Sequence, residues 1–157
     1  MNVQAHPTTI IAVDPESRQR SMIVEIHPEI GGEAPDRVIG AFERRMFDRN
    51  VRVGLIVTPA WTYVVRDLLK SMSFDDNEFD VSKVETPLLL QAATLGPPKT
   101  GGAFSRQVLT WLEAIAGAWS SFLPSEAVPA MVPEVIGNLA QAHFEQWDDV
   151  LEAGDAA

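Results

Sequence analysis

Residues 6–28 read HPTTIIAVDPESRQRSMIVEIHP, and this stretch decides how the chain begins to fold. Residues 8–13 and 21–26 are rich in β-branched side chains, which favour strands. The polar segment between them contains an Asp-Pro pair, which is typical of a turn. We therefore predict an antiparallel hairpin. Its second strand ends at Glu25-Ile26-His27, which places a carboxylate and an imidazole two residues apart, on one face.

A helix and a buried strand are predicted next. Residues 35–49 follow a Gly-Gly pair and carry apolar side chains at helical spacing. These are Val38, Ile39, Phe42, Met46 and Phe47. Residues 51–59, VRVGLIVTP, form a nearly continuous apolar run. Such a run indicates a strand covered on both faces, inside a mixed or parallel sheet.

The remainder of the chain reads as mostly helical. Residues 61–67 predict an edge strand that passes into a short helix, and residues 73–85 predict an acidic loop. Residues 86–102 read as a short helix or strand followed by a loop. Residues 103–123 form a strongly amphipathic pattern. A last helix is expected from about residue 133 to residue 152, with His143 and Trp147 on its apolar face.

The predicted fold class is α/β, with a small mixed sheet and a helical C-terminal extension. Residues 1–95 would form the core, and residues 96–157 would pack on it to give a single structural unit. The absence of cysteine excludes disulfides and thiolate zinc sites and fits a reducing compartment, so we expect a cytoplasmic protein. We see no secretory signal and no apolar run of the ~20 residues that span a bilayer, so no membrane partner is expected.

The charge of the chain is uneven. The sequence holds 22 acidic and 12 basic residues, a formal net charge of −10. Nine acids and nine bases fall in residues 1–70, so the whole excess lies in the second part. An acidic excess repels the phosphate backbone of nucleic acids. Nucleic acid could therefore bind only at a local basic face.

The order of hairpin, helix and strand, with an acid at the end of the second hairpin strand, resembles the PD-(D/E)xK superfamily of restriction-endonuclease-like nucleases. The resemblance covers residues 6–66. In that family an Asp on one strand and a Glu-x-Lys on its antiparallel neighbour bind a divalent metal and activate water. Here Glu25 matches the Glu, and His27 stands where the family has Lys. A turn centred near residues 16–17 would place Thr8 opposite Glu25, give or take about two positions, where the family has Asp.

The resemblance implies vestigial catalytic positions at Glu25, His27 and Thr8, with Glu25 as a weak metal ligand. Because two of the three motif side chains are replaced, it favours a catalytically disabled nuclease-like domain that acts as a protein-interaction or regulatory module, without a cofactor. One alternative is a metal-dependent nuclease that keeps weak or altered activity with Mg²⁺ or Mn²⁺ through Glu25 and His27. Another is a structural module unrelated to nucleases.

Other candidate residues have competing interpretations. Asp14 could replace the missing acid, but turn chemistry explains it better. His6 could join His27 and Glu25 around a transition metal, but polar strand ends are the simpler interpretation. Five arginines on and after the first helix could bind phosphates or could form a solvated helix face. They are Arg37, Arg44, Arg45, Arg49 and Arg52.

A protein partner or a second copy is expected to bind the acidic C-terminal third. Its tryptophans, Trp111, Trp119 and Trp147, could be core or interface residues.

Overall fold

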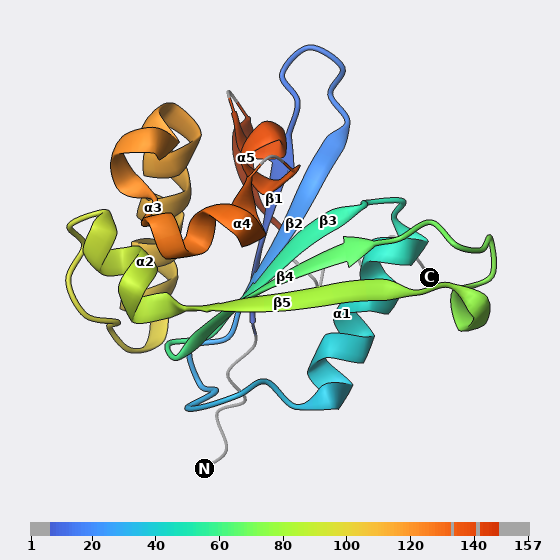
Figure 1. The fold of residues 1–157 in the computed structure, drawn as a ribbon, viewed down its shortest axis with the longest axis horizontal. Helices are drawn as coiled ribbons and strands as arrows, with labels where there is room; N and C mark the ends of the chain where they lie inside the picture. Colours follow the sequence, from blue (N-terminus) through green and yellow to red (C-terminus); the bar gives the residue numbers. More distant parts are fainter. Residues whose placement is uncertain (1–6, 133, 141, 148–157) are drawn as a thin grey trace.

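The computed structural model describes residues 7–132, 134–140 and 142–147. These residues form an α/β fold with a six-stranded mixed sheet in the order β5-β4-β3-β2-β1-β6 (Figure 1). The strands are β1 (Thr8–Val13), β2 (Arg20–Ile26), β3 (Val53–Val57), β4 (Trp61–Asp67), β5 (Phe79–Glu85) and β6 (His143–Trp147). The helices are α1 (Asp36–Asp48), α2 (Thr86–Ala92), α3 (Gly101–Phe122), α4 (Val128–Met131) and α5 (Glu134–Leu139), with 3-10 turns η1 (Phe74–Asp76) and η2 (Ser125–Ala127).

The predicted hairpin is present, and its turn is the expected one. β1 and β2 pair antiparallel, and the Asp14 carboxylate accepts the backbone N–H of Glu16 at 2.9 Å. The Asp14 N–H also donates to the carbonyl of Gln19. Asp14 therefore serves the turn, as its Asp-Pro context indicates.

The hairpin register differs by one residue from the prediction, because β2 contains a bulge. Next to the turn, Val13 pairs with Arg20, as a turn centred near residues 16–17 requires. The register then shifts, so that Ala12 pairs with Met22 and Thr9 pairs with Glu25. A one-residue shift moves a side chain to the other face of a sheet. The predicted pairing of Thr8 with Glu25 is thus wrong, because Thr8 pairs with Ile26 on the opposite face.

Helix α1 connects two parallel strands and covers one face of the sheet. β2 and β3 pair parallel from Ile23–Gly54 to Ile26–Val57. α1 buries Phe42 and Met46 fully on this face, and a Cβ added at Gly54 would lie 2.6 Å from the Phe42 ring. Glycine at position 54 therefore lets the helix approach β3 closely. The predicted helix and buried strand are both confirmed.

The other four helices cover the opposite face, where the larger core lies (Figure 1). α3 supplies the fully buried Phe104, Val108, Leu112 and Ile115, and Trp111 is 1% exposed. The predicted amphipathic helix over 103–123 is confirmed, with an irregular backbone at Ala118 (φ −154°, ψ 59°) near its end. In the described residues, no helix combines the length and apolar character of a membrane span.

Two strands replace elements that were predicted otherwise. The acidic segment 73–85 contains strand β5, so β4 is not the edge strand, and residues 68–73 form no helix after it. The predicted helix over 133–152 is wrong in its described part, because the short α5 is followed by β6, which pairs with β1. The C-terminal third is thus only partly helical, and it completes the same sheet as the hairpin. β5 and β6 lie at the two edges of the sheet, where polar side chains are tolerated and the apolar pattern is weak.

Candidate functional site

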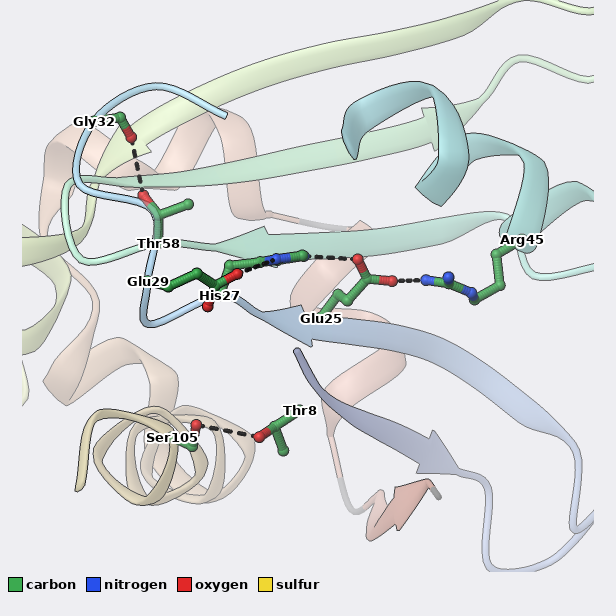
Figure 2. A network of polar contacts seen from close by, with 8 residues as sticks. All are labelled: Thr8, Glu25, His27, Glu29, Gly32, Arg45, Thr58 and Ser105. Carbon is green, nitrogen blue, oxygen red and sulfur yellow. Dashed lines mark hydrogen bonds and ion pairs between the residues drawn. The ribbon is translucent and has the colours of Figure 1, made fainter. Parts of the chain in front are cut away.

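Glu25 lies near the end of β2, on the face covered by α1, and is only 3% exposed. His27 follows two residues later and is 6% exposed. Its backbone N–H donates to the carbonyl of Val57 at 2.9 Å, which continues the pairing with β3. The His27 ring nitrogen Nε2 lies 2.7 Å from Glu25 Oε1 (Figure 2). The predicted carboxylate–imidazole pair therefore exists, and it is buried.

Arg45 of α1 neutralises the charge of Glu25. Its Nη1 forms an ion pair with Glu25 Oε2, opposite the oxygen that meets His27 (Figure 2). Arg45 lies in the last turn of α1, next to the buried Met46, so the helix that packs on the sheet also delivers the guanidinium. A buried carboxylate without a partner is strongly destabilising. Both Glu25 oxygens are instead held by the chain's own side chains.

His27 lies between two carboxylates but is largely desolvated. Its Nδ1 is 3.2 Å from Glu29 Oε1. Burial lowers the pKa of His27 below its ordinary value of 6.5, and the hydrogen bond and charge of Glu29 oppose this only in part. The ring is therefore mainly neutral at pH 7 and has one N–H, which the shorter contact assigns to Nε2, the donor to Glu25. The Nδ1 contact with Glu29 becomes a hydrogen bond only when the ring is protonated.

The two threonines of β1 point to different faces of the sheet. Thr8 Oγ1 shares a 3.3 Å hydrogen bond with Ser105 Oγ of α3, away from Glu25 (Figure 2). Thr9 is the residue that faces Glu25. It is 1% exposed, and its hydroxyl has no hydrogen-bond partner in the described part of the chain. The site is thus Thr9, Glu25, His27 and Arg45, and Thr8 does not belong to it.

The arginines predicted as phosphate contacts do not form one ridge. Arg45 faces Glu25, whereas Arg44 pairs with Asp48 at 3.3 Å and lies over the Phe74 ring, 4.9 Å from its centroid. Arg37 is exposed in the first turn of α1. For Arg44, the solvated-face interpretation fits the contacts better than phosphate binding.

The remaining candidates are His6, His143 and the tryptophans. His6 falls outside the described residues, so the transition-metal alternative that includes it has no geometry to weigh. His143 lies on β6 rather than on a helix, and its side chain is 67% exposed. Trp111 is a core residue, and Trp119 is 36% exposed.

The donor set around Glu25 does not suit a divalent metal. Mg²⁺ and Mn²⁺ prefer carboxylate and carbonyl oxygens. Here the Glu25 oxygens face a guanidinium and an imidazole N–H, and the residue paired with Glu25 on β1 is Thr9, which offers a hydroxyl in place of a carboxylate. Within the residues that the structure describes, no group of three His, Asp or Glu side chains could hold a metal ion.

The chain was compared with protein-family models, with curated proteins and with solved structures, and none of them matches it.

The lowered pKa of His27 predicts a pH dependence of stability. Between pH 6.5 and the lower folded-state pKa, the unfolded chain binds a proton that the folded chain does not. The free energy of unfolding should therefore decrease as pH falls through this window and be recovered as pH rises. Urea unfolding at a series of pH values should show this slope in the wild type and in the control His143→Gln, and a smaller slope in His27→Gln. If the free energy of unfolding depended equally on pH in all three proteins, the assignment of this dependence to His27 would be contradicted.

Proposed function

We propose that this chain is a catalytically disabled nuclease-like domain that works as a protein-interaction or regulatory module. The observation that carries the proposal is that Glu25 is already engaged inside the fold: the Arg45 guanidinium neutralises its charge, and the His27 imidazole contacts its other oxygen. The order β1, β2, α1, β3 supports the resemblance to the PD-(D/E)xK superfamily, because β1 and β2 are antiparallel and β2 and β3 are parallel. Glu25 lies near the end of the second hairpin strand, as the motif requires.

Three side chains at this site support the proposal that the domain is catalytically disabled. Thr9 lies across from Glu25, where the superfamily would supply a second carboxylate. His27, kept mainly neutral by burial, offers less electrostatic help than a lysine. Arg45 places a permanent positive charge next to the one remaining carboxylate. A metal ion that bound Glu25 would have to displace the Arg45 guanidinium, which already forms an ion pair with this carboxylate.

The enzymatic alternative is tested directly by incubation with single- and double-stranded DNA and RNA in Mg²⁺ or Mn²⁺. The proposal expects no cleavage above a blank. Metal-dependent cleavage by the wild type that disappears in Glu25→Ala would overturn it.

Restoring the second carboxylate should create a metal site. In Thr9→Asp/Arg45→Ser, two carboxylates face each other without the competing guanidinium. We expect saturating Mn²⁺ to raise the midpoint of thermal unfolding of this variant by roughly 4 °C or more. Thr8→Asp/Arg45→Ser is the matched control, because it places the same new charge on the opposite face. The wild type and the control should not respond. An equal shift in all three proteins, or none in the Thr9 variant, would contradict the proposal.

The connection between β4 and β5 supports the binding part of the proposal. We call residues 68–73 the apolar loop, because Leu68, Leu69 and Met72 are 43%, 56% and 98% exposed. Large exposed apolar side chains that lie close together mark interaction sites. Trp111, by contrast, is buried in the core and is not available as an interface anchor in the helical third.

Hydrogen bonds hold the apolar loop in one conformation. The Asp67 carboxylate accepts the N–H of Leu69 at 2.8 Å and the side-chain amide of Asn77 at 2.7 Å. Asn77 Oδ1 in turn accepts the N–H of Lys70 at 2.8 Å. Leu69 adopts φ 56°, a left-handed conformation that is costly for a leucine. The loop is thus preorganised to present its apolar side chains, which reduces the entropy lost on binding a partner.

The variant Leu69→Gly should increase stability but abolish binding, so it tests the two effects separately. Glycine accepts the left-handed conformation, so we expect the free energy of unfolding in urea to rise by about 0.5–1 kcal/mol. The same variant should lose its protein partner, or its self-association, because the exposed leucine is removed. The measurements are mass in solution and quantitative mass spectrometry of co-purifying proteins, with Lys70→Ala as the control. A Leu69→Gly protein that keeps the same partner and the same mass as the wild type would contradict the proposal.

A further inference from the structure

The β1–β2 hairpin separates from the sheet at the end opposite Glu25. The pairing of β1 with β2 continues to Val13–Arg20, whereas the pairing of β2 with β3 begins only at Ile23–Gly54. Residues 20–22 of β2 therefore have no partner on β3. A hollow of about 570 Å³ opens there between the hairpin turn, the α1–β3 connection and α5. This volume lies within the range of small-molecule sites.

A second hollow extends the first. It has a volume of about 370 Å³ and shares Gln19, Arg20 and Asn50 with its neighbour. Arg18 and Arg49 line the second hollow, and Arg52 lines the first. We call the two hollows together the arginine trough.

The arginine trough is positively charged in a strongly acidic protein. Among the described residues that line it, four are arginines and two are acids, Asp14 and Glu134, so their formal charge is +2, whereas the chain carries −10. Glu134 is 3.2 Å from Arg66 Nε, and Asp14 accepts a backbone N–H of its own turn. Glu134 is thus already paired, and Asp14 is held by the hairpin turn. Counted over the described residues, the trough keeps a net positive charge, which favours an anionic ligand.

The lining also indicates which anion fits. Among the described residues that line the two hollows, none is aromatic, and Val53 is the one large apolar side chain. These residues offer a nucleobase no ring on which to stack. Guanidinium forks from two loops suit a compact anion of high charge density, whose oxygens can meet several arginines at once. The separated single charges of an acidic peptide fit this arrangement less well.

We propose that the arginine trough binds a chain of linked phosphates, from either inorganic oligophosphate or the polyphosphate group of a nucleotide. The proposal does not depend on the disabled nuclease site. Arg20 and Glu25 are five residues apart on one strand, about 17 Å at strand spacing. The two sites can therefore be tested separately.

The test is isothermal titration of the full chain with sodium tripolyphosphate, ATP and adenosine at roughly 50 mM salt. We expect saturable one-to-one binding of tripolyphosphate and ATP and none of adenosine. Equal affinities for tripolyphosphate and ATP would identify the phosphate chain alone as the ligand. Much tighter binding of ATP than of tripolyphosphate would identify a nucleotide. Absence of saturable binding of both phosphate compounds would overturn the proposal.

Variants locate the binding. Arg18→Gln/Arg52→Gln removes two exposed trough residues, and we expect it to weaken tripolyphosphate binding by about tenfold or more. Arg37→Gln/Arg106→Gln removes the same charge from exposed positions on α1 and α3 and should stay within about twofold of the wild type. Thermal unfolding of each variant checks its fold. An equal loss of tripolyphosphate affinity in both double variants, or no loss in Arg18→Gln/Arg52→Gln, would show that the arginine trough is not the binding site.

Discussion

The ion pair between Glu25 and Arg45 links the hairpin, the crossover helix and the centre of the sheet. Glu25 is 3% exposed on β2, and a carboxylate there needs a positive partner from within the chain. Arg45 meets that need only because α1 lies close to β3, where Gly54 leaves room for the Phe42 ring. His27 then occupies the second carboxylate oxygen. The neutralisation of Glu25 therefore depends on the close packing of α1 against the sheet.

The bulge in β2 decides which threonine meets this charge. Without the bulge, the pairing next to the turn would have brought Thr8 across from Glu25. With it, Thr9 faces Glu25 and Thr8 turns toward Ser105 of α3. Ser21 lies at the bulge, and its hydroxyl contacts the carbonyls of Ala12, at 3.2 Å, and Asn138, at 3.1 Å. A contact with a helix more than 100 residues away thus accompanies the local irregularity that sets the register.

These contacts explain which features could be predicted from the sequence. The hairpin, α1, β3 and α3 have strong apolar patterns or clear turn chemistry, and each was predicted within about two residues. Strands β5 and β6 were missed, because edge strands carry mixed polar patterns and owe their conformation to backbone pairing with β4 and β1. Glu25 and His27 could be found because they are two residues apart at the end of one predicted strand. Thr9 and the role of Arg45 could not, because the first depends on a bulge and the second on how a helix packs.

The most direct measurement of the central claim is a double-mutant cycle on Glu25 and Arg45. Glu25→Gln, Arg45→Met and the double variant would be unfolded in urea at pH 7, and their free energies compared with the wild type. The account predicts that Arg45→Met is the more destabilising single change, because it leaves a buried charge. It also predicts a coupling energy of about 2 kcal/mol or more. Effects that add to within about 0.5 kcal/mol would show that Glu25 does not depend on Arg45, and would contradict the account.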